Sequence, residues 1–130
     1  MEAHAAQLLA IVSAAVPDAA AVAAMRWRMA QALRDHCTRE DRQVYDRLLS
    51  SGDAAATNIA WCHRAEHGLL GPAFANYMAA WPVGRISGEW ERFRAETRIL
   101  MADLAERIER EERLLFPHVE RVIARQRAAA

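Results

Sequence analysis

The 130-residue sequence predicts an all-α protein, folded as an up-down-up-down four-helix bundle in one domain over residues 1–130. Alanine, leucine, glutamate and arginine dominate, and strand-forming residues never alternate with polar ones over a useful length. Helix-breaking residues gather in only three places, at Pro17-Asp18, at 50–53 and at 81–88. Between these breaks, apolar residues recur at three- and four-residue spacing, which is typical of helices with one buried face.

The first expected helix covers residues 2–16 and ends before Pro17, which cannot continue a helix. Its inward stripe is His4, Leu8, Ile11 and Ala15. The second expected helix covers 19–49 and ends at the Ser-Ser-Gly-Asp turn. Its inward stripe is Val22, Met25, Met29, Leu33, His36, Glu40 and Val44.

The third expected helix covers residues 54–80, up to the Trp-Pro break, and the fourth covers 88–126. The third stripe is Ile59, His63, His67, Leu70, Phe74, Tyr77 and Trp81. The fourth stripe is Trp90, Phe93, Thr97, Leu100, Leu104, Arg107, Glu111 and Leu115. Since the connections are short, neighbouring helices are expected to run antiparallel.

Charge and composition exclude several classes of function. The 17 basic and 17 acidic residues cancel, so the chain lacks the charge of a general nucleic-acid or acidic-membrane binder. Every basic residue is arginine, which excludes a catalytic lysine. Two cysteines, Cys37 and Cys62, are too few for a disulfide scaffold, so we expect a cytoplasmic protein with free thiols. The alanine-rich stretch 8–25 has neither a basic start nor an unbroken span, so we expect no signal peptide and no membrane helix.

Polar residues interrupt the apolar stripes at matching heights. In an antiparallel hairpin, two residues equally far from the turn lie at one level. The midpoint of His36 and His67 falls within the turn at 50–53, and so does the midpoint of Glu40 and His63. The midpoints of His67 with Arg107, and of His63 with Glu111, fall at Ser87 in the third break. The expected layers are His4, His36, His67 and Arg107, and beside them Glu40, His63 and Glu111.

Such a set of buried imidazoles and carboxylates predicts a metal site. Burying these groups without partners costs several kcal/mol, and coordination of a cation removes that cost. Imidazole and carboxylate groups on facing helices are the usual construction of a dinuclear iron or manganese site in a helical bundle. Any one of these histidines alone is more often a hydrogen-bonded core residue, so the prediction depends on the whole set.

The sequence resembles the hemerythrin-like (HHE cation-binding) family across nearly the whole chain. The second expected helix reads HCTREDRQVYD and the fourth reads RIEREERLLFP, which align with each other as an internal repeat. The HRAEH stretch resembles the third helix of that family. The most specific match is the segment Glu111, Glu112, Leu115, Phe116 and Pro117. The internal repeat favours Glu111 over Glu112 as the inward carboxylate.

The resemblance implies a non-haem iron centre, di-iron in its usual form, with a mononuclear site or another metal as alternatives. By this resemblance, His4 and His36 would ligate one iron, His63 and His67 the other, and Glu40 and Glu111 would bridge them. The implied ligands are O2 or NO, and the implied role is to bind them or to sense oxygen, redox state or iron. A sensor of this kind would signal to a regulatory protein partner.

Arg107 stands where the resembling family has a histidine, and a protonated arginine is not a metal ligand. Three outcomes are open. The second iron keeps an open position, or Arg107 pairs with Glu111 and leaves a mononuclear site, or Arg107 turns to the surface among its charged neighbours. Two other functions are also open. One is a metal-free or structurally metallated module for regulatory protein interactions. The other is a di-iron oxidase or peroxidase, although the sequence shows no recognisable substrate pocket and we expect no enzyme.

Overall fold

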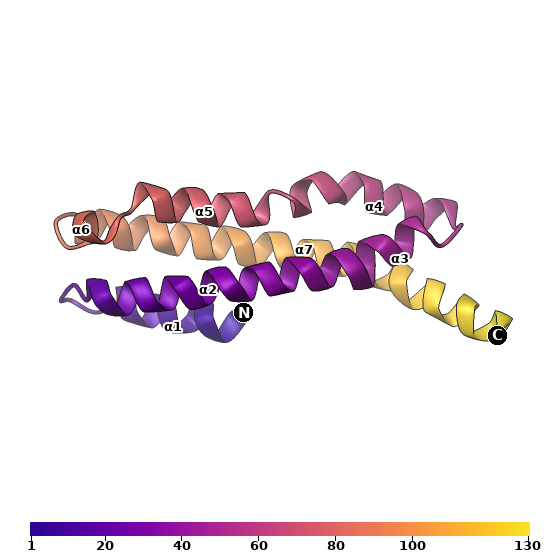
Figure 1. Ribbon diagram of the computed structural model, residues 1–130, viewed down its shortest axis with the longest axis horizontal. Coiled ribbons are helices and arrows are strands. Elements are labelled where there is room, and N and C mark those ends of the chain that lie inside the picture. Colours follow the sequence, from indigo (N-terminus) through magenta and orange to yellow (C-terminus); the bar gives the residue numbers. More distant parts are fainter.

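In a computed structural model, which describes residues 1–130, four helical rods run side by side in alternating directions (Figure 1). The first rod is α1 (Glu2–Val12). The second joins α2 (Ala19–Glu40), the π-helical segment η1 (Asp41–Tyr45) and α3 (Asp46–Leu49). The third joins α4 (Ala54–His67) and α5 (Leu70–Ala80), and the short α6 (Val83–Ile86) leads into the fourth, α7 (Trp90–Ala129). The predicted all-α, up-down-up-down arrangement is confirmed.

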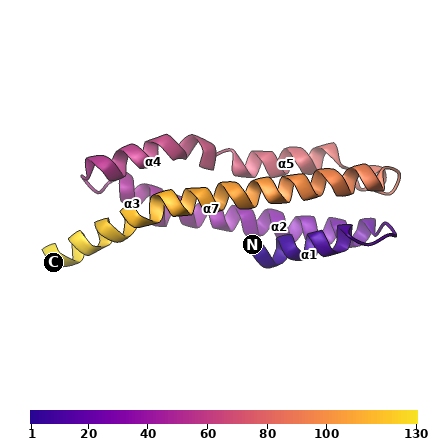
Figure 2. The ribbon, with the colours of Figure 1, turned by 180° about the vertical axis from the view of Figure 1, so that it is seen from behind.

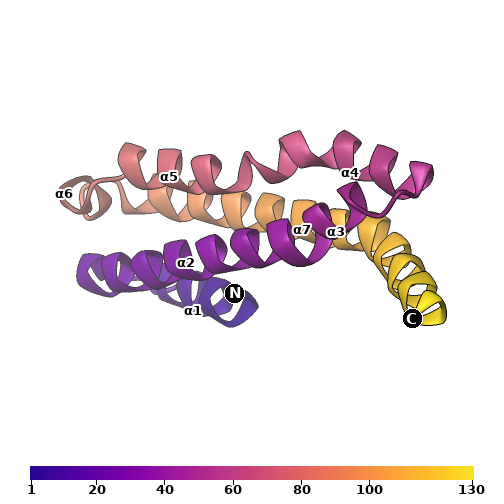
Figure 3. The same ribbon diagram turned by 45° about the vertical axis from the view of Figure 1, so that its right-hand side comes forward.

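The rods differ from the expected helices at three points. The first helix ends at Val12 rather than at residue 16. The third is interrupted at Gly68-Leu69, so that α4 and α5 are separate helices. The fourth continues to Ala129 and its end passes beyond the other rods (Figure 3).

The unequal lengths of the rods leave one end of the molecule with three rods only. The first rod has 11 residues and α7 has 40, so α1 accompanies α7 over part of its length (Figure 2). The end that contains α3 and the start of α4 therefore lies beyond the reach of α1.

Aspartates set the starts of the two middle rods. The Asp18 carboxylate accepts a hydrogen bond from the Ala21 amide at 3.0 Å, and Asp53 accepts one from the Ala56 amide at 2.9 Å. Both are N-caps, which satisfy amides that the helix itself leaves unpaired. The turn before Asp53 uses Gly52 at φ +73°, a conformation that favours glycine.

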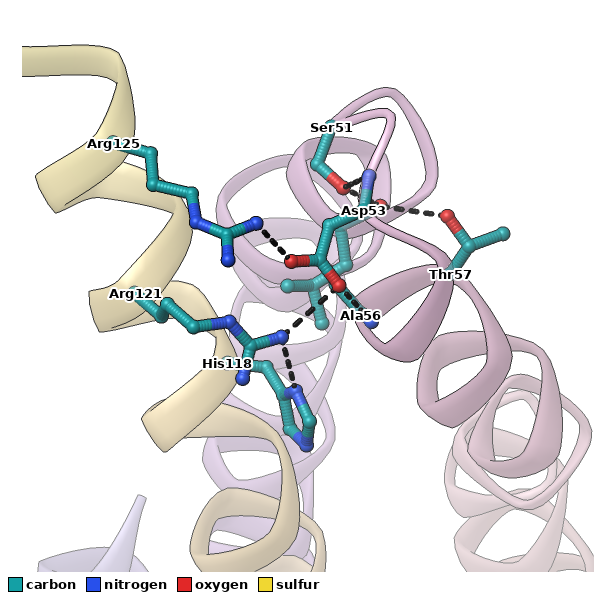
Figure 4. Close-up of polar contacts among 8 residues, drawn as sticks. Ser51, Asp53, Ala56, Thr57, His118, Arg121 and Arg125 are labelled. Carbon is teal, nitrogen blue, oxygen red and sulfur yellow. Dashed lines mark hydrogen bonds and ion pairs between the residues drawn. The ribbon is translucent and has the colours of Figure 1, made fainter.

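Asp53 also joins the turn before α4 to the end of α7 (Figure 4). Its Oδ1 accepts a hydrogen bond from Arg121 at 3.0 Å, and its Oδ2 accepts one from Arg125 at 2.6 Å. The same Arg121 donates to Nδ1 of His118 at 3.0 Å. One carboxylate thus caps α4 and holds the C-terminal turns of α7.

The buried apolar residues form two separate cores. The larger core has 15 residues and fills the half of the bundle that contains α1, α5 and the start of α7. The smaller one has seven residues and lies among α3, α4 and the later part of α7. On the second, third and fourth rods, the series of buried apolar residues is interrupted at one level of the bundle. The interruptions lie between residues 33 and 44, between 60 and 70, and between 104 and 115. The polar residues that interrupt the stripes lie in this interval.

Candidate metal centre

Three donor groups from two helices meet between the two apolar cores. His36 and Glu40 lie one turn apart on α2, and Glu112 reaches them from α7. One ligand atom from each of the three lies within 4.8 Å of the others. Nε2 of His36 is 3.7 Å from Oε1 of Glu40. We refer to His36, Glu40 and Glu112 as the three-residue group.

Two atoms of this group are buried without a hydrogen-bond partner, namely Nε2 of His36 and Oε2 of Glu40. Burial, together with the charges of Glu111 and Glu112, raises the pKa of Glu40 to about 7. Burial also lowers the pKa of His36. A buried carboxylate oxygen and an imidazole nitrogen that lack partners are the donors that a cation would satisfy. The residues present therefore fit a metal ion.

His67 forms the centre of a second polar group, next to the first. Its Nδ1 lies 3.0 Å from Oε1 of Glu111, and its Nε2 lies 3.1 Å from Oδ1 of Asp41. Burial alone lowers the pKa of His67, but the hydrogen bond and charge of Glu111, aided by Asp41, raise it above the usual value. His67 is thus favoured as a cation between two carboxylates.

Tyr45 packs against His67 in this second group. Its ring centroid lies 4.7 Å from that of His67, and its hydroxyl is buried without a hydrogen-bond partner. Burial and the charge of Glu111 raise the pKa of Tyr45, so the phenol stays protonated.

His4 and His63, the other two predicted ligands, lie outside both groups. His4 is half-buried on α1, with an Nδ1 atom that is buried and has no hydrogen-bond partner. His63 is half-buried on α4, and its Nδ1 lies 3.8 Å from Oε2 of the exposed Glu66. The structure brings together His36 with Glu40, and His67 with Glu111, but neither pair with His4 or His63.

The pairing between the third and fourth rods differs from the expected one by about one turn. Glu111 contacts His67, although the midpoint argument placed Glu111 opposite His63 and Arg107 opposite His67. The expected pairing requires one straight helix over residues 54–80, whereas the rod is interrupted at Gly68-Leu69, directly after His67. The pairing across the first hairpin holds, since Nε2 of His67 lies 3.4 Å from the carbonyl oxygen of Cys37.

Arg107 pairs with an acidic neighbour on its own helix, in line with the third of its three expected orientations, and an open position at a second iron stays a prediction. Its Nε lies 3.2 Å from Oδ2 of Asp103, one turn earlier on α7, and about a third of its side chain is exposed. It forms no ion pair with Glu111.

Both acidic residues of the Glu111-Glu112 pair take part in the site, in different groups. Glu111 is buried against His67, as the internal repeat predicts, while the half-buried Glu112 completes the three-residue group. Asp41 was not expected in the site. It is the first residue of η1, and π-helical turns of this kind are frequent at functional sites but leave no pattern in a sequence.

The model of the hemerythrin HHE cation-binding domain family matches residues 1–119. The chain belongs to this family. No curated protein and no solved structure matches it. This HHE-domain protein is therefore a cation-binding helical protein, and its family binds diatomic ligands. None of its helices combines the length and the hydropathy needed to span a lipid bilayer.

Proposed function

We propose that this HHE-domain protein, as a single domain over residues 1–130, binds non-haem iron and through it O2 or NO, and thereby senses oxygen, redox state or iron. The observation that carries this proposal is the pair of buried, unpartnered donor atoms in the three-residue group, Nε2 of His36 and Oε2 of Glu40. Imidazole and carboxylate donors suit iron, and they also suit manganese and zinc.

His36, Glu40 and Glu112 would hold the first ion. When bound, iron supplies a coordination position and the electrons that a diatomic ligand requires. The chain itself contributes an apolar core on each side of the site along the bundle. It also contributes two carboxylates that offset the charge of the cation.

His67 and Glu111 would hold a second ion together with His63, as the resemblance to the family implies, while His4 would join His36 at the first ion. His67 must first lose the proton that its contacts with Glu111 and Asp41 favour. The second position is therefore expected to fill less readily than the first, and more readily as the pH rises.

The test is the metal content per chain of protein purified without oxygen, with an absorption spectrum before and after air. About two irons per chain would support a di-iron centre, and one would support a mononuclear site at the three-residue group. The double variant His36→Ala/Glu40→Ala should lose this iron. The control is Glu109→Ala, because Glu109 is an exposed carboxylate on the same helix as Glu112. Undiminished iron in the double variant would contradict the assignment.

One observation favours a second candidate function, a metal-free module for regulatory protein interactions. Both ring nitrogens of His67 already have carboxylate partners. If the purified protein retains no metal and its melting temperature is unchanged by a chelator, this second function is the better one.

A further inference from the structure

The seam between α2 and α7 is covered by a helix along only one half of the bundle. In that half α1 contacts both α2 and α7, and its first residues line a hollow together with His36 and Glu112. The start of α1 therefore lies beside the three-residue group. Beyond this level no rod covers the seam (Figure 2), and an open groove with a volume of about 500 Å³ lies between α2–α3 and α7.

Both walls of this groove are helix faces. One wall follows α2–α3 from residue 36 to 47, and the other follows α7 from residue 112 to 123. At about 1.5 Å per residue, each wall is roughly 16 Å long, which is three helical turns. The apolar lining residues are Val44, Phe116, Val119 and Ile123. A groove of this shape, between two helices and with an apolar floor, fits a third helix laid along it.

The floor of the groove is only partly shielded from water. Phe116 is 40% exposed, and Val119 and Ile123 are half-buried. A docked helix with an apolar stripe would remove these surfaces from water, as α1 does for its side of the larger core.

The two edges of the groove carry opposite charges. Arg39 and Arg47 lie on the α2–α3 edge, and Glu120 lies on the α7 edge. Arg39 and Glu120 are exposed and form no ion pair, while Arg47 donates only to neutral oxygens, of Gln43 and Gln126. None of these charges belongs to the three-residue group, so an ion bound there leaves them unpaired. They favour a helix with acidic residues towards α2–α3 and basic residues towards α7.

We propose that the groove docks one amphipathic helix of a partner protein, with its apolar stripe on Phe116 and Val119. The acidic flank of this helix faces α2–α3 and its basic flank faces α7. The helix lies end to end with α1 and takes no donor atom from the three-residue group. Since it reaches His36 and Glu112 at one end of the groove, it is the partner to which the proposed sensor would signal, and in this role the proposal rests on the proposed function.

The experiment is a calorimetric titration of the full chain with designed helical peptides, on samples whose metal content has been measured. The probe peptide has leucines at three- and four-residue spacing, glutamates along one flank and arginines along the other. The control peptide has the same composition, but its glutamates and arginines alternate along both flanks, so it matches the groove in neither direction. We expect saturable binding of one probe per chain, and about tenfold weaker binding of the control peptide.

A charge-reversal variant tests the edges of the groove. Arg39→Glu/Arg47→Glu makes both edges acidic, so it should weaken binding of the probe about tenfold and favour a peptide with arginines on both flanks. The matched control is Arg28→Glu/Arg98→Glu, because these two arginines are exposed and lie outside the groove. It should bind the probe as the wild type does.

Two further variants test the floor. Val119→Asp places a charge under the apolar stripe and should weaken probe binding about tenfold or more. Ile99→Asp is its matched control, since Ile99 is 70% exposed on the same helix and lies outside the groove. Phe116→Ala keeps the test decisive if Val119→Asp fails to fold, and we expect it to bind the probe about three- to tenfold more weakly.

Native circular dichroism together with undiminished probe affinity in a folded floor variant would overturn the proposal. So would equal affinity for the probe and control peptides, the absence of saturation in the wild type, or a stable dimer in which a second copy covers the groove. Metal content separates the two proposals. A chain that binds iron but not the probe contradicts only the docking site, and one that binds the probe without metal contradicts only the metal function.

Discussion

The carboxylate of Glu111 lies 3.0 Å from Nδ1 of His67, and both side chains are more than nine-tenths buried. The other ring nitrogen of His67 lies 3.1 Å from the Asp41 carboxylate. These two contacts join α4 to α7 and to the start of η1, at the level between the two apolar cores. The metal-free protein is thus held together in its polar interval by a histidine between two carboxylates.

Replacing Glu111 by glutamine should destabilise the metal-free protein, and more so at low pH. The pKa of His67 is raised in the folded state, so its stabilisation is complete below about 6.5 and is lost as the pH rises through the folded value. We expect Glu111→Gln to lower the free energy of unfolding by about 3 kcal/mol at pH 6 and by clearly less at pH 9. Urea unfolding at both pH values measures this. An equal loss of unfolding free energy at the two pH values would show that His67 is not charged in the folded state. The control is Glu109→Gln, which should leave the unfolding free energy unchanged at either pH.

Glu40 should make the metal-free protein less stable as the solution is brought to neutral pH. Burial and the neighbouring Glu111 and Glu112 raise its pKa from 4.5 to about 7. Between these values the folded state keeps a proton that the unfolded chain has lost, so stability falls as the pH rises. The lost stability is about 2–3 kcal/mol over this window.

The measurement is the difference in unfolding free energy between Glu40→Gln and the wild type, because the lowered pKa of His36 acts in the opposite direction in both proteins. That difference should grow in favour of the variant from pH 4.5 to pH 7. A difference that does not change with pH would show that Glu40 is ionised throughout this window.

The sequence was sufficient to predict the four rods and the polar interval. Breakers delimit the rods, and the apolar spacing identifies the buried faces, because both signals are local. His36, Glu40, His67 and Glu111 were expected inside the bundle, and three of them are buried while His36 is half-buried. The family resemblance is confirmed by the match over residues 1–119.

Features that arise from tertiary packing could not be predicted in this way. A single glycine is tolerated within a helix, so Gly68 gave no sign that the third rod is interrupted there. The π-helical segment that begins at Asp41 has ordinary helix-forming residues, and its extra residue per turn is visible only in the backbone. Both irregularities lie next to the contacts of His67, because the interruption follows His67 directly and the π-helical segment begins at Asp41, one of its two carboxylate partners.

Arg107 should be dispensable for both stability and metal content. It forms a half-exposed ion pair with Asp103 on the same helix, and such pairs contribute less than about 0.5 kcal/mol. Arg107→Ala should therefore unfold at nearly the wild-type urea concentration and bind the same amount of metal. Arg26→Ala gives the contrast, since Arg26 is buried and donates a hydrogen bond to the Trp81 carbonyl at 2.9 Å, and we expect it to cost about 2 kcal/mol or more. A large loss of metal from Arg107→Ala would place Arg107 in the site after all.

Asp53 should stabilise the folded protein through its two arginine partners as well as through its N-cap of α4. Asp53→Asn keeps an acceptor for the Ala56 amide but loses the charge that holds Arg121 and Arg125, while Asp53→Ala loses both. We expect Asp53→Asn to lower the melting temperature by a few degrees, and Asp53→Ala to lower it further.

The matched control is Asp18→Asn, because Asp18 caps α2 and forms no ion pair with an arginine. It should melt close to the wild type. High salt screens exposed charges, so 1 M NaCl should reduce the gap in melting temperature between Asp53→Asn and the wild type. It should not reduce the further drop in melting temperature from Asp53→Asn to Asp53→Ala. The Ala56 amide and the two arginines also lower the pKa of Asp53, and the gap should therefore close as the pH falls through that lowered value. If the gap is the same at both salt concentrations, Asp53 acts through its cap alone and the end of α7 is held by its apolar contacts.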